Sequence, residues 1–242
     1  MKQGNKIYEG KAKILYETDN PDCVLQYFKD DATAFNAQKR GTIIDKGVCN
    51  NRISSALFAY LEGKGIPTHF VKQLDDRTML VKRLEIVPLE VTIRNITAGG
   101  MSRMLGIEEG IVLKPPVFEW HYKSDALADP LINDDHILAM GYATEAELAR
   151  IRSESFKVND ALKAFFNERK IDLVDFKLEF GRHKGTILLG DEISPDTMRL
   201  WEHGTRNKLD KDRFRRDLGS VEEAYQEVLR RVLGEKQQVV RT

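Results

Sequence analysis

The segment Leu173–Gly181 combines charged side chains in a pattern that suits metal and phosphate chemistry. Side chains alternate across a strand, so Asp175, Lys177 and Glu179 would share one face of it. Carboxylate oxygens suit Mg²⁺, and a lysine offers a point charge to phosphate. The alternative is an amphipathic surface strand with a solvated polar face, and the alternating pattern alone favours that alternative.

A second strand is expected over 186–193 and ends in further carboxylates. If 181–185 forms the loop between the two strands, Asp191 can fall on the same face as Glu179. A Mg²⁺ ion held by one or two carboxylates and the phosphates of a nucleotide is the usual arrangement in proteins. The residues therefore suggest a metal and phosphate site, and a solvated strand pair remains the alternative.

Two further segments place basic groups beside glycines. In Tyr8–Lys13, a hairpin with one glycine and two lysines could lie over phosphates, although a plain hairpin with exposed lysines is the more common case. In Val87–Gly100, Arg94 leaves a strand shortly before a glycine pair and could clamp a phosphate bidentately. A strand-end arginine paired with a surface carboxylate is an equally good interpretation of Arg94.

Charged residues in the second half of the chain are less specific signals. Arg199 follows Pro195 on a polar turn of the kind that often carries binding groups, and a short capped helix with a surface arginine is the alternative. The alternating charges of 208–216 usually indicate a solvated segment, as do the charged residues at 123–125 and 129.

Strands and helices must position these segments. Short strands are expected within 6–28, 69–84, 89–96 and 173–193, and helices over 46–62, over 144–170 and from Ser220 onward. Thr144 with Glu147, and Ser220 with Glu223, have the spacing of capping boxes. The glycines and prolines of 97–142 predict long loops with short helices. Strands first and helices later predict an α+β protein with a lobe boundary near residue 85.

Composition narrows the class of protein. The chain has 242 residues, 41% of them hydrophobic and 31% charged, as expected of a globular protein in water. Its 38 basic and 38 acidic residues balance, which counts against a general nucleic-acid binder. No apolar run approaches the length of a membrane helix, about 20 residues. Cys23 and Cys49 form no CxxC pattern, so a reduced cytoplasmic protein is expected. A homodimer is the default expectation, because dimers are the commonest assembly.

Taken together, these segments resemble the SAICAR synthetases, the phosphoribosylaminoimidazole-succinocarboxamide synthases of purine biosynthesis. The resemblance runs from about Lys6 to Leu233. The segment LVDFKLEFG matches one family signature without departure, and Ile86–Gly100 matches the PLExxxRxxxAG signature. The stretches YEGKAK, GDEISPD and DKDRFR also match, in order. The one departure is Gly99-Gly100, where the family usually has Gly-Ser.

The resemblance implies a two-lobed α+β fold. Residues 1–85 would form an antiparallel-sheet lobe similar to the ATP-binding lobe of protein kinases, with ATP in the cleft between the lobes. Residues 86–242 would form a larger lobe that binds L-aspartate, metal and the carboxylated aminoimidazole ribonucleotide (CAIR). The implied ligands are ATP, Mg²⁺, CAIR and L-aspartate, and the implied products are SAICAR, ADP and phosphate. A catalytically silent nucleotide-binding regulator on the same fold is the alternative.

The resemblance also implies roles for single residues, carried over by position. Gly10, Lys11, Ala12 and Lys13 would cover the ATP phosphates, and the backbone of Lys82 to Leu84 would meet adenine. Lys177 would neutralise phosphate charge, while Glu179 and Asp191 would hold Mg²⁺. Arg94 and Arg199 would grip the 5′-phosphate of CAIR, and Asp196 would reach its ribose.

Five residues complete the implied site. Gly100 has no hydroxyl, so its backbone N–H or the Ser102 side chain would replace the contact that the family's serine makes with the phosphate. Lys123, Asp129 and Arg215 are candidates for binding aspartate and for acyl transfer. No residue stands out as a dedicated general base for the aspartate amine.

Overall fold

Strands from the first third of the chain form an antiparallel sheet. The computed structural model describes residues 2–34 and 38–235. The sheet has the order β1-β2-β3-β7-β6. Its strands are β1 (Gln3–Glu9), β2 (Lys13–Thr18), β3 (Cys23–Phe28), β6 (Phe70–Gln73) and β7 (Thr78–Lys82). Strands β4 (Asp31–Ala34) and β5 (Lys39–Thr42) pair separately. The predicted hairpin joins β1 to β2, and the Gly10 N–H donates to the Lys13 carbonyl across it at 2.9 Å.

The second sheet contains both signature segments as neighbouring strands. Its order is β10-β9-β8-β11-β12, and β13 pairs with β11. These strands are β8 (Glu85–Ile96), β9 (Val112–Tyr122), β10 (Leu131–Ile132), β11 (Ile171–His183), β12 (Thr186–Leu189) and β13 (Met198–Glu202). Strand β11 runs antiparallel to β8, so Asp175 lies opposite Arg94 and Glu179 lies opposite Glu90. The pairing brings two segments far apart in sequence onto one polar strip.

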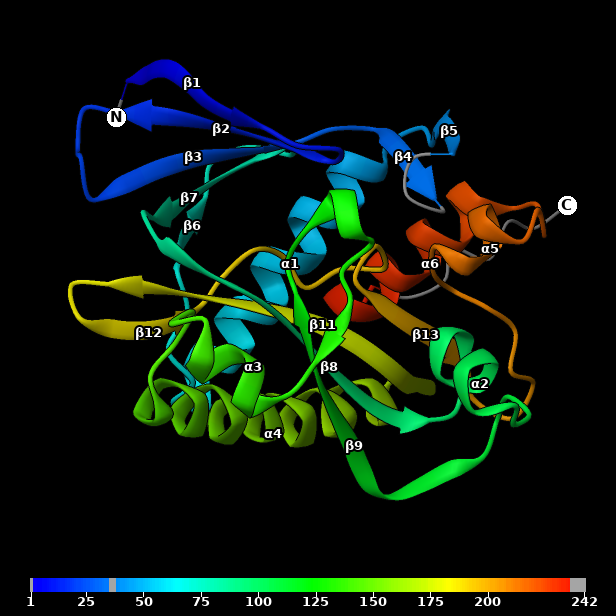
Figure 1. Cartoon of the computed structure of the whole chain (residues 1–242). Coiled ribbons are helices and arrows are strands. Elements are labelled where there is room, and N and C mark those ends of the chain that lie inside the picture. Colours follow the sequence, from blue (N-terminus) through cyan, green and yellow to red (C-terminus); the bar gives the residue numbers. More distant parts are fainter. Residues whose placement is uncertain (1, 35–37, 236–242) are drawn as a thin grey trace, which may run out of the picture.

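Helices cover the sheets in two groups (Figure 1). The described helices are α1 (Lys46–Gly63), α2 (Gly99–Leu105), α3 (Asp134–Ala139), α4 (Glu145–Glu168), α5 (Asp212–Arg215) and α6 (Val221–Leu233), with the 3₁₀ turn η1 (Asp125–Leu127). Helix α4 packs against β8, β11 and β12, and α1 packs against β3, β6, β7 and α6. The mixed architecture with antiparallel sheets agrees with the predicted α+β class.

The predicted helix starts have different outcomes. Helices α1 and α4 begin and end close to the predicted residues, and the capping box at Thr144 is confirmed because Thr144 and Glu147 exchange both bonds. The capping box at Ser220 is wrong. Ser220 has a left-handed backbone with φ of 46°, and its side chain makes no bond to the start of α6. A capping side chain needs an extended backbone at this position, and Ser220 does not have one.

The prediction of loops over 97–142 is also partly wrong, because that stretch contains the long strand β9. Pro115 and Pro116 argued against a strand. They lie beside a register shift between the pairs Arg94–Val117 and Ile96–Val112 of β8 and β9. At such an irregularity the backbone N–H groups do not all bond the neighbouring strand, so a residue without an N–H fits there. Proline is tolerated at such irregularities, and the sequence does not reveal where they fall.

One hydrophobic core extends across both sheets. It contains Phe28 of β3, Leu57 and Phe58 of α1, Phe166 of α4 and Phe176 of β11, all buried. An isolated parallel bridge between 68 and 189 also links the segment before β6 to β12. The sheets change between β7 and β8, near residue 85, but the core is continuous there, so the division into 1–85 and 86–242 stays a prediction. None of the described helices is long and apolar enough to cross a bilayer.

Candidate active site

A cavity of about 730 Å³ lies between the β1–β2 hairpin and the polar strip of the second sheet. Nearly all of the predicted site residues line it. They are Gly10, Lys11, Ala12, Lys13, Lys82, Leu84, Arg94, Lys123, Asp129, Lys177, Glu179, Asp191, Asp196, Arg199 and Arg215. Sequence segments from 10 to 215 therefore converge on one place, and their individual roles stay predictions.

Gly100 and Ser102 do not line this cavity. Gly100 is exposed on α2, and Ser102 is buried with no hydrogen-bond partner for its Oγ. The neighbouring Gly99 is the glycine that the packing requires. It has φ of +57°, and a Cβ there would lie 2.4 Å from an Arg199 guanidinium nitrogen. The predicted contact of Gly100 or Ser102 with a phosphate therefore has no support from their position.

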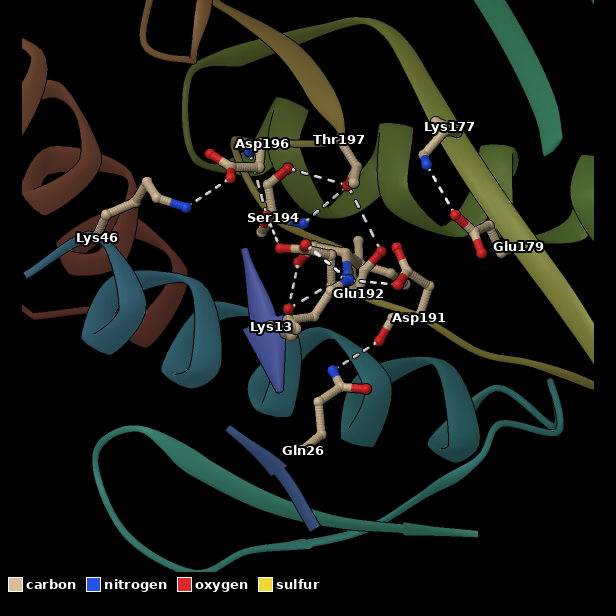
Figure 2. Close-up of polar contacts among 12 residues, drawn as sticks. Lys13, Gln26, Lys46, Lys177, Glu179, Asp191, Glu192, Ser194, Asp196 and Thr197 are labelled. Carbon is tan, nitrogen blue, oxygen red and sulfur yellow. Dashed lines mark hydrogen bonds and ion pairs between the residues drawn. The ribbon is translucent and has the colours of Figure 1, made fainter. Parts of the chain in front are cut away.

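A lysine–carboxylate cluster lines the cavity, and five of its members, Lys13, Lys177, Glu179, Asp191 and Glu192, are labelled in Figure 2. We use this name for Lys13, Lys123, Lys177, Glu90, Glu179, Asp191 and Glu192. Lys177 Nζ lies 2.6 Å from Glu90 Oε1 and 2.8 Å from Glu179 Oε1. Like charges directly opposite each other on neighbouring strands are destabilising, so Lys177 makes the facing Glu90 and Glu179 compatible.

Lysines from other elements complete the cluster. Lys123 Nζ, just after β9, lies 2.7 Å from Glu179 Oε1. Lys13 of β2 pairs with Asp191 and lies 2.9 Å from Glu192 Oε1. The β1–β2 hairpin is therefore tied to the second sheet by charge, across the cavity.

The carboxylates of this cluster have opposite pKa shifts. Burial and the neighbouring Glu179 carboxylate raise the pKa of Asp191. Burial also opposes ionisation of Glu179, but Lys177 and Lys123 outweigh it and lower its pKa. Burial and the Glu179 charge raise the pKa of Glu90, although Lys177 acts to lower it. The crowding of negative charge around Asp191 is a condition that an added cation would relieve.

The backbone around Asp191 differs from the predicted strand. Strand β12 ends at Leu189, and Asp191 has a left-handed backbone with φ of 57°, which an extended strand cannot continue. The Gly190 N–H still donates to the Glu179 carbonyl at 2.9 Å, and Gln26 Nε2 donates to the Asp191 carbonyl at 3.0 Å. The expected proximity of Asp191 and Glu179 is therefore reached through a turn.

The donor set fits a Mg²⁺ ion only in part. Within residues 2–34 and 38–235, no group of three or more His, Cys, Asp or Glu side chains is arranged to hold a metal. Glu179 and Asp191 both line the cavity, and Mg²⁺ commonly takes one or two carboxylates together with nucleotide phosphates and water. The chemistry of these two residues suits a metal that arrives with a nucleotide.

A second charge cluster, the arginine–carboxylate cluster, lies beside the cavity and partly lines it. We use this name for Arg94, Arg199, Arg215, Glu119, Asp175 and Asp212. Asp175 of β11 lies between two arginines: Arg94 Nη1 of β8 is 2.9 Å from Oδ2, and Arg199 Nη1 of β13 is 2.9 Å from the same atom. Its neighbours on both sides are therefore cations, which explains how a 4% exposed carboxylate remains paired.

The remaining contacts of this cluster also pair guanidinium with carboxylate. Arg94 Nη2 lies 2.7 Å from Glu119 Oε2. Asp212 accepts from Arg199 Nε at 2.9 Å and from Arg215 Nη1 at 2.6 Å. Arg94 thus pairs with buried carboxylates, not with the surface carboxylate that the sequence left as an alternative.

Several residues that line or support the cavity were not found from the sequence. Asp196 accepts hydrogen bonds from Lys46 Nζ at 2.7 Å and from the Tyr225 hydroxyl at 2.6 Å, and Lys46 is fully buried. A lysine that starts a helix normally faces water, so no sequence signal marked it. Glu90 could have been predicted, because it lies four residues before Arg94 on the same strand and so shares its face.

The mouth of the cavity is bridged by exposed groups. Lys11 Nζ of the hairpin lies 2.6 Å from Asp125 Oδ1 of η1. Asp129 accepts the Ser124 N–H at 2.8 Å, which shapes the loop that carries Lys123. The solvated character that the sequence predicted for this loop holds for Asp125, whose side chain is 70% exposed, and less for Asp129, which is half-buried; both residues line the cavity.

A sequence model of the SAICAR synthetase family matches residues 6–232. The chain belongs to this family. It is 60% identical to the phosphoribosylaminoimidazole-succinocarboxamide synthase of Chloroherpeton thalassium, over 97% of the chain and 100% of that protein. It is 57% identical to the synthase of the same name from Clostridium acetobutylicum, over 97% of the chain and 100% of that protein.

Solved structures agree with this membership. The synthase from Ehrlichia chaffeensis superposes with a TM-score of 0.93 at 47% identity, covering 96% of this chain and 100% of that one. A SAICAR synthetase described as a complex with ADP has a TM-score of 0.92 at 44% identity, covering 96% and 99%. As a family member over its length, the chain is an ATP-dependent ligase of purine biosynthesis, and the alternative of a silent nucleotide-binding regulator is not favoured.

Proposed function

We propose that the cavity is the active site in which the enzyme joins L-aspartate to the carboxylate of CAIR, at the expense of ATP. One observation carries this assignment: residues from seven separate sequence segments, predicted from the resemblance, line a single cavity. The cavity has a cationic group for each anionic ligand of the proposed reaction. Its two charge clusters lie next to each other along the polar face of β11.

The two clusters divide the ligands between them. The lysine–carboxylate cluster includes Lys13 of the glycine-containing hairpin and both predicted metal ligands, so it suits the phosphates of ATP with Mg²⁺. Adenine would then meet the backbone of 82–84 in the kinase-like cleft. The arginine–carboxylate cluster carries guanidinium groups, whose planar fork suits the 5′-phosphate of CAIR. Asp196 also lines the cavity and would meet the ribose.

Lys177 is the member of the lysine–carboxylate cluster that lies next to the arginine–carboxylate cluster on β11. It alternates with Asp175 on one side and Glu179 on the other, about 7 Å away along the strand in each direction. An ammonium group there is placed to neutralise a phosphoryl group that passes from ATP to the CAIR carboxylate. Such transfer depends mainly on positioning and charge stabilisation.

The proposed chemistry has two steps. The CAIR carboxylate oxygen attacks the γ-phosphorus of ATP, ADP leaves, and an acyl phosphate forms. The aspartate amine then attacks the acyl carbon, loses a proton and expels phosphate, which leaves the amide of SAICAR. Lys123, Asp129 and Arg215 line the cavity beside this position and are the candidates for orienting aspartate. Mg²⁺ would supply charge neutralisation at the phosphates. A homodimer and a cytoplasmic location complete the proposal.

Phosphate release tests this function directly. The enzyme is incubated with ATP, Mg²⁺ and CAIR, with and without L-aspartate, and phosphate and products are followed. Release that needs both CAIR and aspartate, with a succinocarboxamide product by mass, is the expected result. Release without aspartate would mean that water attacks the acyl phosphate, and the second substrate would then be wrong. No release from folded protein that still binds ATP would overturn the proposal.

A further inference from the structure

Asp210 is a buried carboxylate that does not line the cavity. Its side chain is fully buried, and each of its oxygens accepts a backbone N–H. Oδ1 accepts from Asp212 at 2.7 Å, and Oδ2 accepts from Leu200 at 2.8 Å. The first bond closes a local turn, whereas the second reaches across to β13. Asp210 therefore connects two segments of backbone that approach each other only in the folded protein.

Both of these backbone positions carry the arginine–carboxylate cluster. Leu200 directly follows Arg199 on β13. Asp212 begins α5 and accepts hydrogen bonds from Arg199 Nε at 2.9 Å and from Arg215 Nη1 at 2.6 Å. Any displacement of the Asp212 backbone from that of Leu200 would change the distance between the two guanidinium groups. Asp210 links these two backbone positions, and its side chain bonds neither guanidinium group.

We propose that Asp210 is a positioning residue that holds Arg199 in the orientation required by the phosphorylated substrate, through its bonds to Leu200 and Asp212. The proposal rests on the proposed function, in which Arg199 binds the 5′-phosphate of CAIR; Arg215, a candidate for orienting aspartate, is held by the same Asp212 carboxylate. A guanidinium fork recognises a phosphate only when its N–H groups point at the oxygens, so a small displacement weakens binding strongly. Asp210 itself would not contact a ligand, because it does not line the cavity.

The link requires an ionised carboxylate. Two carboxylate oxygens can accept both backbone N–H groups, whereas a protonated acid or an amide offers a single good acceptor. Burial and the nearby Asp212 charge raise the pKa of Asp210 to about 7, so the link is sensitive to pH near neutrality. The titratable and charged groups that face Asp210 are Asp212 and Arg215 of α5, Arg199 of β13, Tyr225 of α6 and the preceding Lys208.

A purely structural role for Asp210 makes a different prediction. A core carboxylate that only supports the fold would, when replaced, lower stability and change every kinetic constant together. A positioning residue changes the affinity for one substrate. The KM values for CAIR and for ATP, measured on folded protein, therefore separate the two roles.

Two variants remove the link in different ways. Asp210→Ser keeps a hydroxyl that can accept the Asp212 N–H and so retains the local turn, but it cannot reach Leu200. Asp210→Asn keeps the size of the side chain but leaves one N–H facing an amide NH₂. We expect either variant to raise the KM for CAIR about tenfold and leave the KM for ATP unchanged. Asp217→Asn is the matched control, since Asp217 is exposed and bonds only Lys39 among the contacts of the described residues.

The pH dependence of ligand affinity also separates the two roles, because a purely structural role for Asp210 would not change it. The probe is ribose 5-sulfate, whose sulfate charge is constant near neutrality. In the wild type and in Asp217→Asn, its Kd should fall severalfold between about pH 6 and about pH 8 as Asp210 ionises. In Asp210→Asn the Kd should be weak throughout this range and nearly independent of pH.

Arg199→Gln separates failure of this proposal from failure of the proposed function. If Arg199→Gln leaves the KM for CAIR unchanged, the phosphate assignment is wrong, and the role of Asp210 is wrong with it. If Arg199→Gln raises that KM but both Asp210 variants keep the wild-type value, only the positioning role is overturned. If Asp210→Asn does not fold, Asp210→Ser with the same measurements decides, because its local turn is retained.

Discussion

The two charge clusters of the cavity are built on opposite principles. In the lysine–carboxylate cluster, three flexible lysines face four carboxylates. Burial and the neighbouring Glu179 charge raise the pKa of Asp191 there. In the arginine–carboxylate cluster, each carboxylate is matched by a rigid guanidinium, and the pKa of Glu119 is lowered. We therefore expect the first cluster to exchange partners with incoming ligands and the second to keep a fixed shape.

The elements that carry the clusters reinforce this difference. The arginine–carboxylate cluster comes entirely from the second sheet and α5. The lysine–carboxylate cluster also takes Lys13 from the first sheet, so it changes if the two sheets move apart. If the nucleotide enters between the hairpin and the second sheet, as proposed, we expect it to reorganise the lysine–carboxylate cluster without disturbing the other.

The largest expected effect comes from neutralising a carboxylate in the lysine–carboxylate cluster. Glu179→Gln removes a predicted metal ligand and a partner of both Lys177 and Lys123. We expect turnover to fall at least a hundredfold, because charge stabilisation at the transferring group is lost. Phosphate release measured at saturating substrates checks this.

The same variant tests whether the clusters are independent. Glu179→Gln should bind ribose 5-sulfate with the wild-type Kd, while Arg199→Gln should lose that binding and keep its affinity for ADP. Loss of both affinities in either variant would contradict the division of ligands between the clusters.

A smaller effect is expected on stability, with opposite signs for Glu119 of the arginine–carboxylate cluster and Asp191 of the lysine–carboxylate cluster. Burial acts to raise the pKa of Glu119, but its bonds with His121 and Arg94 lower it to about 2. An acid whose pKa is lowered on folding stabilises the protein above its unfolded pKa and loses that contribution as pH falls through its folded pKa. Glu119→Gln should therefore cost about 3 kcal/mol at neutral pH.

Urea unfolding across acidic and neutral pH checks this sign. The difference between wild type and Glu119→Gln should shrink as pH falls from about 4.5 towards about 2. The contrast is Asp191→Asn, in buffer without divalent cations. Because the folded pKa of Asp191 is raised, its charge destabilises the fold at neutral pH, and this variant should be no less stable than wild type there. A large loss of stability in Asp191→Asn would remove the contrast between the clusters.

The smallest effect is expected at the mouth of the cavity. Asp125→Asn removes the ion pair between η1 and Lys11, whose side chains are 70% and 41% exposed. Exposed pairs contribute about 0–1 kcal/mol, so the KM for ATP should change less than about fivefold. The change should favour ATP, because Lys11 no longer has a competing carboxylate. A tenfold loss of affinity would show that the pair holds the hairpin in its binding position.

Local patterns predicted what depends on neighbouring residues in the chain. The alternation in Leu173–Gly181 located Lys177 and Glu179 on one strand face, and apolar periodicity located α1 and α4. The Thr144 capping box was predictable because both partners lie within one helical turn. The assignment of all these segments to one site came from the family resemblance and not from any pattern.

What the sequence did not reveal depends on pairing between distant segments. Strand β11 is flanked by β8 and β13, and only this register puts Arg94 and Arg199 on either side of Asp175. The irregular pairing that accommodates Pro115 and Pro116 in β9 is likewise set by a partner strand. The left-handed backbone of Asp191, which ended β12 early, depends on contacts with β3 and β11 that no local pattern records.

The burial of Lys46 has a consequence for synthesis of the chain. Its ammonium pairs with Asp196, 150 positions later, and that carboxylate is shared with Tyr225 of the last described helix. A ribosome adds roughly 5–20 residues per second, so the amino-terminal half waits several seconds at least for these partners. During that time Lys46 must remain hydrated and α1 cannot dock in its final place. We therefore expect the nascent chain to complete its fold only near the end of translation, and to depend on chaperones until then.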